Sequence, residues 1–129
     1  MRAGAGASLE RGRQEIGAAR ALLQAGFPSQ AVSRAYMAGL HAAQAALLEL
    51  GEVPHTRTGV VSAFGRRVVR EDGLEHEAGR RLRRLRENRD DVDYGLATAP
   101  DSAALAAIDD AELLVAATED WMKRRVSRS

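Results

Sequence analysis

The sequence of 129 residues contains no cysteine. Disulfide bonds and metal sites built from thiolates are therefore excluded. The three histidines, His41, His55 and His76, stand too far apart along the chain to predict a zinc cluster by themselves. We expect no metal and no other cofactor.

Long apolar runs are also missing. No run approaches the roughly 18 residues that a membrane-spanning helix requires, and residues 1–8 lack the apolar centre of a secretory signal peptide. We therefore expect a cytoplasmic protein that does not bind a membrane. The formal net charge is only +1 and aromatic residues make up 4% of the chain, so neither overall charge nor stacking side chains predict nucleic-acid binding.

The chain lacks alternating runs of β-branched residues, the pattern of a β-strand. Apolar residues instead recur at helical spacing, and 45% of the residues are hydrophobic, a fraction typical of a folded protein. We predict one all-α domain over residues 1–129, with frayed tails at 1–7 and 126–129. Glycine and proline divide this domain into five helical segments, at about 8–25, 28–50, 56–71, 74–94 and 101–125.

The segment at 28–50 is apolar on nearly every side. Val32 and Tyr36 belong to its main apolar stripe, and alanines occupy the opposite side, where Arg34 and His41 are the polar exceptions. A helix of this kind is buried on two sides. Its second side is covered either by other helices of the bundle or by another subunit, because small residues allow close approach. We expect self-association, as a homodimer formed through this helix.

Arg89 stands where the helical pattern requires an apolar residue. Leu82, Leu85 and Val92 would form the buried stripe of the segment at 74–94, and Arg89 falls inside that stripe. An enclosed guanidinium keeps its charge and needs acceptors for its N–H groups. We therefore predict a polar cluster that either locks this helix to the segment at 28–50 or carries chemistry. The predicted cluster consists of Arg89, Asp93, Tyr94 and Tyr36.

Three blocks of the sequence resemble HEPN domains. They are SRAYMAGLHAA at 33–43, PHTRTGVVSAFG at 54–65, and Arg89 followed by Asp93 and Tyr94. In their order and spacing they are similar to a family of small stand-alone HEPN proteins of bacteria and archaea. The resemblance covers about half of the chain, from Ser33 to Tyr94.

The resemblance implies an up-and-down bundle of four or five helices that frequently dimerises. It also implies a partner, because HEPN proteins are often paired with a minimal nucleotidyltransferase, commonly as toxin and antitoxin. Several HEPN branches are metal-independent ribonucleases that use an Arg followed, after four to six residues, by a His. Here Tyr94 takes the place of that His, and Arg57 stands where many relatives have His.

Two other pairs fit the ribonuclease spacing, Arg34 with His41 and Arg70 with His76. The first pair lies on one helix, with its members roughly 10 Å apart along the axis, a distance that a phosphate could bridge. His41 would then act as acid or base, and Arg34 or Arg89 as the cation that stabilises the phosphorane. The alternative is that His41 is a packing residue.

The arginines at 80, 81, 83, 84 and 86 resemble a nucleic-acid stripe, but residues 66–93 hold nine Arg and eight acidic residues. This balance is typical of a salt-bridged surface, to which Arg66, Arg67 and Arg70 add a local basic patch. RNA and nucleotides remain further candidate ligands.

The sequence predicts a HEPN-type interaction module that self-associates and acts with a nucleotidyltransferase in a toxin–antitoxin or stress-response system. A ribonuclease toxin with Arg34, His41 and Arg89 in a composite cleft at a dimer interface is the alternative. A third hypothesis is a small-molecule or nucleotide binder that uses Arg89 and Tyr94.

Overall fold

The computed structural model describes residues 2–95 and 98–128. Within these ranges every regular element is a helix, so the prediction of an all-α domain is confirmed. The elements are α1 (Ala5–Gln24), α2 (Pro28–Glu49), α3 (Arg57–Ala63), the π-helix η1 (Phe64–Arg70), α4 (His76–Tyr94) and α5 (Asp101–Arg128). No helix in the described part of the chain combines the length and apolarity that a membrane crossing needs.

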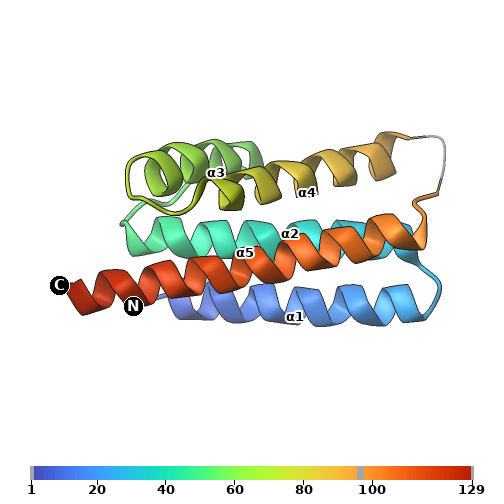
Figure 1. Ribbon diagram of the computed structural model, residues 1–129, viewed down its shortest axis with the longest axis horizontal. Coiled ribbons are helices and arrows are strands. Elements are labelled where there is room, and N and C mark those ends of the chain that lie inside the picture. The colour runs from blue at the N-terminus through green and yellow to red at the C-terminus, as the bar shows by residue number, and fades with distance from the viewer. Residues whose placement is uncertain (1, 96–97, 129) are drawn as a thin grey trace.

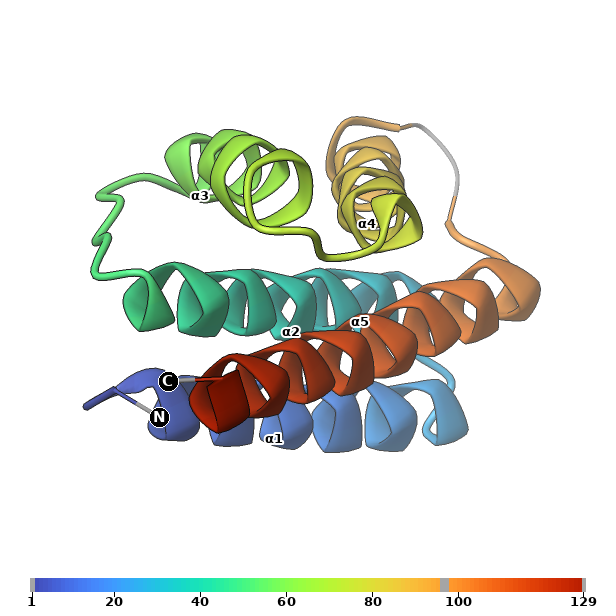
Figure 2. The same ribbon diagram turned by 60° about the vertical axis from the view of Figure 1, so that its left-hand side comes forward.

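The long helices run side by side with alternating directions, as expected for an up-and-down bundle (Figure 1). α2 is the central helix. α3, η1 and α4 lie on one side of it, and α1 and α5 lie on the other (Figure 2). Its alanines and Leu47 are completely buried, whereas Gln30 and Arg34 face solvent.

The second apolar side of α2 is covered by α1 and not by another subunit. Gly12 of α1 comes so close to α2 that an added Cβ would lie 3.2 Å from the carbonyl oxygen of Ala38. Small residues on both helices allow this approach. The predicted homodimer through helix 2 is therefore wrong in its location, because helices of the same chain already bury that surface.

Both ends of the chain are more helical than predicted. α1 begins at Ala5, which is fully buried, so residues 5–7 are not a frayed tail. Ser8, where the first segment was predicted to begin, lies inside the helix, and its hydroxyl donates a hydrogen bond of 2.8 Å to the carbonyl oxygen of His41. α5 continues through Arg128, past the predicted end at 125. Residues 1 and 129 lie outside the described ranges.

The segment predicted at 56–71 is two helices in sequence. Thr56 caps α3, because its side-chain oxygen accepts the N–H of Gly59 at 2.9 Å. The chain then widens into η1, where residues of the π-helix bond five positions apart and Phe64, Val68 and Val69 all face the core. Apolar spacings of four and five fit a π-turn as well as an α-turn, so the sequence pattern did not separate them.

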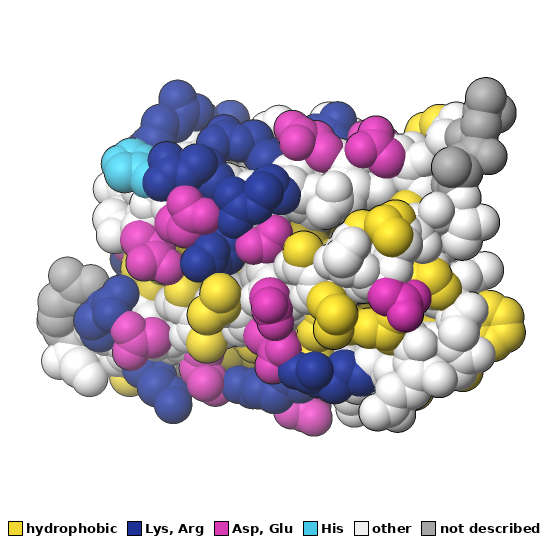
Figure 3. All heavy atoms as spheres, turned by 45° about the vertical axis from the view of Figure 1, so that its right-hand side comes forward, with side chains coloured by type: hydrophobic (Ala, Val, Ile, Leu, Met, Phe, Trp, Pro, Cys, Tyr) yellow, Lys and Arg dark blue, Asp and Glu magenta, His cyan; other side chains and the backbone are white. Residues whose placement is uncertain are grey.

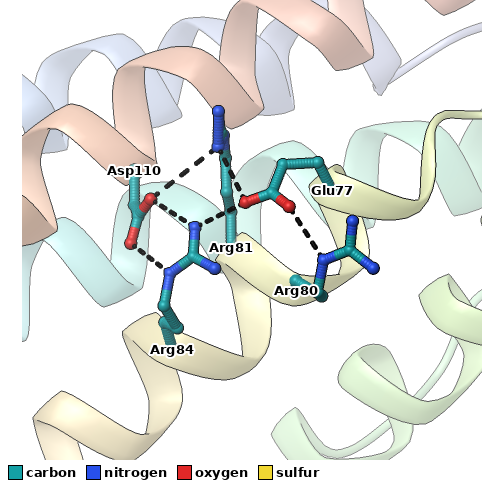
Figure 4. A network of polar contacts seen from close by, with 5 residues as sticks. All are labelled: Glu77, Arg80, Arg81, Arg84 and Asp110. Carbon is teal, nitrogen blue, oxygen red and sulfur yellow. Dashed lines mark hydrogen bonds and ion pairs between the residues drawn. The ribbon is translucent and has the colours of Figure 1, made fainter.

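A network of charged side chains ties α4 to α5 (Figure 4). The Arg84 guanidinium donates to Asp110 of α5 at 2.9 and 3.1 Å and to Glu77 at 2.8 Å. Arg80 also donates to Glu77, at 2.8 Å. The hydrogen bonds from Arg84 and then Arg80 lower the pKa of Glu77 from 4.5 to about 2.

This network predicts a loss of stability in acid. Because the folded state lowers the pKa of Glu77, its carboxylate stabilises the fold fully above pH 4.5 and progressively less as the pH falls towards 2. We expect the wild type to be more stable than Glu77→Gln near neutral pH and the difference to shrink on acidification. Urea denaturation of both proteins across this range measures it, and a pH-independent difference would contradict the assignment.

Candidate functional site

A cavity of about 420 Å³ opens where α2, α3 and α4 meet. Three arginines from three different elements reach it: Arg34 from α2, Arg57 from the start of α3 and Arg89 from α4. The full lining consists of Leu22, Gln30, Ser33, Arg34, Tyr36, Met37, Arg57 and Arg89. This concave, positively charged cavity can accept an anionic group.

Arg34 holds one rim of the cavity. Its Nη1 donates to both carboxylate oxygens of Glu15 on α1, at 3.3 Å each. The side chain is about half exposed, at 53%, so the pair is solvated and weak. Arg34 can therefore turn towards an incoming anion at little cost.

Arg89 lies at the edge of the core and not inside it. Leu82 and Leu85 are buried as predicted, but the Arg89 side chain is 28% exposed. It forms an ion pair with Asp93, whose Oδ2 lies 2.8 Å from the Arg89 Nε, and Asp90 Oδ1 lies 3.7 Å from Nη1. The guanidinium is therefore only partly enclosed, with two carboxylates beside it.

Tyr36 forms the inner wall. It is only 4% exposed, and the Arg89 guanidinium carbon lies 5.9 Å from the centre of its ring. Burial raises the pKa of the Tyr36 phenol, and the charges of Arg86, Arg57 and Arg89 oppose that rise. The phenol therefore stays neutral and can donate a hydrogen bond within the cavity.

Tyr94 does not belong to this site. Its side chain is 81% exposed, and it lines a separate hollow with Asp91 and Asn88. The predicted cluster thus reduces to Arg89, Asp93 and Tyr36. The hypothesis of a binding site shared by Arg89 and Tyr94 is not supported by this arrangement.

His41 is also separated from the cavity. It faces α1, where the Cβ that Gly12 lacks would lie 3.7 Å from the His41 Cβ, and its Nδ1 is buried without a hydrogen-bond partner among the described residues. Burial lowers the pKa of His41; nearby Glu15 raises it, and Arg11 lowers it further. His41 is therefore neutral near pH 7. The structure brings Arg34, Arg89 and Tyr36 together and leaves His41 out.

Arg57 is the cavity residue that sequence reasoning did not place in a site. Two signals marked this position in the sequence: it follows the helix cap Thr56 directly, which puts its side chain at the first turn of α3, and it is the position at which many relatives of the resembled family have His. In the part of the chain that the structure describes, no group of three or more His, Asp or Glu side chains could hold a metal ion.

The chain matches the model of a known protein family. Residues 5–121 match the family model of the HEPN domain, which covers every helix described above except the last turns of α5. No curated protein sequence matches the chain significantly.

Proposed function

We propose a function that starts from one premise: this chain belongs to the HEPN domain family. The protein is a helical interaction module. It acts with a minimal nucleotidyltransferase in a toxin–antitoxin or related stress system. We further propose that it self-associates through a surface other than α2. The family supports a helical module. The partner and the system are our hypothesis.

We call the cavity lined by Arg34, Arg57 and Arg89 the three-arginine cavity. Because His41 is separated from Arg34 and Arg89, binding is favoured over catalysis at this cavity. Metal-independent cleavage of RNA needs a base within hydrogen-bond reach of the 2′-hydroxyl and a cation on the same phosphate. Here Arg34 and Arg89 line the cavity, but no histidine does. The cavity can hold an acidic or phosphorylated group of a partner, and its described lining offers no histidine or carboxylate to activate a hydroxyl.

Co-expression tests the partner. The chain is produced together with the nucleotidyltransferase encoded beside its gene, and one of the two proteins carries an affinity tag. We expect a complex that survives gel filtration and that weakens in the double variant Arg57→Ala/Arg89→Ala, with Arg13→Ala/Arg20→Ala on α1 as the charge-matched control. A neighbouring gene of another class, or a pair that elutes separately, would contradict the proposal.

Light scattering on the isolated protein tests self-association. We expect a dimer at micromolar concentration. Dimer formation should leave the α1–α2 contact unchanged, because that contact is internal to each chain. A monomer under these conditions would contradict this half of the proposal.

A ribonuclease toxin is a second candidate, and one observation favours it. Arg70 and His76, which fit the ribonuclease spacing, line the same hollow between η1 and α4. RNA incubated with the protein in EDTA tests this function. We expect no degradation. The opposite result has three parts: the wild type and His41→Ala cleave RNA, His76→Ala does not, and the circular dichroism of His76→Ala shows unchanged helix content. This result would replace the module hypothesis with the ribonuclease function.

A further inference from the structure

One ring nitrogen of His41 is enclosed where α2 packs against α1. This Nδ1 has no hydrogen-bond partner among the described residues. In a neutral imidazole one of the two nitrogens carries no proton, whereas both nitrogens of the protonated ring donate and the ring carries a full charge. An enclosed charged donor needs an acceptor. Protonated His41 therefore requires a carboxylate that neutral His41 does without.

Glu15 of α1 is the acidic side chain that acts on His41. Burial lowers the pKa of His41, and the nearby charge of Glu15 opposes that effect. Side chains on a helix tilt towards its N-terminus. Because α1 and α2 run in opposite directions (Figure 1), the side chains of Glu15 and His41 lean towards each other. Glu15 is thus the acceptor that a protonated His41 would meet.

Glu15 already has a partner in Arg34, at the rim of the three-arginine cavity. Both of its carboxylate oxygens accept from the Arg34 Nη1, at 3.3 Å each. The Glu15 side chain is only 20% exposed, whereas that of Arg34 is 53% exposed. The carboxylate is therefore held at the α1–α2 contact, and the guanidinium is the more mobile member of the pair. One carboxylate stands between two groups that can carry positive charge.

The other charged groups around His41 cannot replace Glu15. Arg11 of α1 is a cation, and its charge lowers the pKa of His41 further. α5 packs against both α1 and α2, and two of its acidic side chains already pair with arginines of α1. Figure 3 shows acidic side chains beside basic ones over α1 and α5, in the lower half of the view. The two pairs are Arg13–Glu119 and Arg20–Glu112.

We propose that the Glu15 carboxylate exchanges between Arg34 and His41, so that protonation of His41 releases Arg34 into the three-arginine cavity. The cavity then gains the full charge of Arg34 and binds an anion more tightly. Burial keeps the pKa of His41 below its ordinary value of 6.5, so the exchange occurs in mildly acidic solution. The proposal rests on the function proposed above for this cavity and adds its regulation by pH.

NMR titration of the histidine rings tests the exchange without any ligand. We expect Glu15→Gln to lower the pKa of His41, because the imidazolium loses its acceptor. We expect Arg34→Gln to raise it, and to raise it less when Glu15→Gln is also present, because then no carboxylate is released. An unchanged pKa in Glu15→Gln would overturn the proposal. Equal effects of Arg34→Gln in both backgrounds would do the same, since Arg34 would then act through its own charge alone.

Titration with sulfate tests the consequence for the cavity, and the amide signals of Tyr36 and Arg57 report binding there. Sulfate keeps its charge over the range in which histidine titrates, between about pH 5 and pH 8. We expect it to bind up to about fivefold more tightly at the acidic end, the limit for releasing a solvated ion pair. Glu15→Gln should bind tightly at both ends of the range, and His41→Gln weakly at both.

Two variants serve as controls. Glu10→Gln removes another carboxylate of α1, one that pairs with Arg13, and His76→Gln removes a histidine outside the α1–α2 contact. We expect both to keep the wild-type pH dependence. Sulfate binding that is absent from the cavity or independent of pH in the wild type would overturn the proposal, and so would an equal loss of pH dependence in His76→Gln and His41→Gln. Melting temperatures confirm that each variant is folded.

The two proposals fail in different experiments. If no complex with a nucleotidyltransferase forms, the function proposed above is contradicted, while the histidine and sulfate titrations of the isolated chain still decide the exchange of Glu15. If the complex forms and the titrations show no coupling, the partner stands and the pH regulation is wrong.

Discussion

Replacing Trp121 with alanine is expected to lower the free energy of unfolding by about 3–5 kcal/mol, the range for deleting a large buried aromatic side chain. Trp121 lies near the C-terminal end of α5 and is 1% exposed. Its Nε1 donates a hydrogen bond of 3.0 Å to the carbonyl oxygen of Asp72, in the turn between η1 and α4. One side chain thus fills the core and fixes the turn between η1 and α4.

Two further contacts strengthen this position. The Arg125 guanidinium carbon lies 5.2 Å from the Trp121 ring centre, and Arg125 also pairs with the Asp72 carboxylate. Trp121→Phe is the matched variant, since it keeps most of the ring and removes the N–H donor. We expect it to cost about 1–3 kcal/mol, because the Asp72 carbonyl then loses its partner. Urea denaturation followed by circular dichroism measures both, and an alanine variant within about 1 kcal/mol of the wild type would contradict the assignment.

Gly12→Val is expected to destabilise the protein by about 1–3 kcal/mol, or more if α1 cannot shift. An added Cβ at Gly12 would lie 3.2 Å from the backbone carbonyl of Ala38 and 3.5 Å from the Val115 side chain. A backbone oxygen in the middle of the central helix cannot move aside as a side-chain tip can. The two helices would have to separate along the contact that covers the second side of α2.

Gly17→Ala is the control on the same helix. Gly17 is exposed, and an added Cβ there would meet nothing within 4 Å. We expect a gain of roughly 0.5–1 kcal/mol, because alanine loses less backbone freedom than glycine on forming a helix. Thermal melts of the two variants should therefore move in opposite directions. Similar behaviour in both would show that α1 and α2 are not in close contact.

The sequence predicted helix starts and ends well where a local residue controls them. Gly26, Gly51 and Gly73 follow three of the predicted segments, and all three have positive φ values, between 79° and 90°. Thr56 caps its helix through a side chain three residues away. These features depend on neighbours in the chain, so the pattern contains them.

The candidate site was predicted only in part, because its members come together through packing. Arg34 and His41 share a helix, yet one reaches the cavity and the other is turned against α1. Arg89 meets Tyr36 as expected, but Arg57 joins them only because α3 folds back across α2. Spacing along one helix does not reveal which neighbour covers which side.

By itself, the sequence determined that this chain is a set of amphipathic helices with defined ends and three blocks of HEPN type. Only the tertiary structure decided that α1 covers the second side of α2 and that His41 is apart from Arg34 and Arg89. It also decided that Arg84 pairs with Asp110, whereas no carboxylate in residues 2–95 or 98–128 pairs with Arg83 or Arg86. Helical periodicity and caps arise from interactions within a few residues. The pairing of charges depends on helices that are distant in sequence and meet only when the core forms.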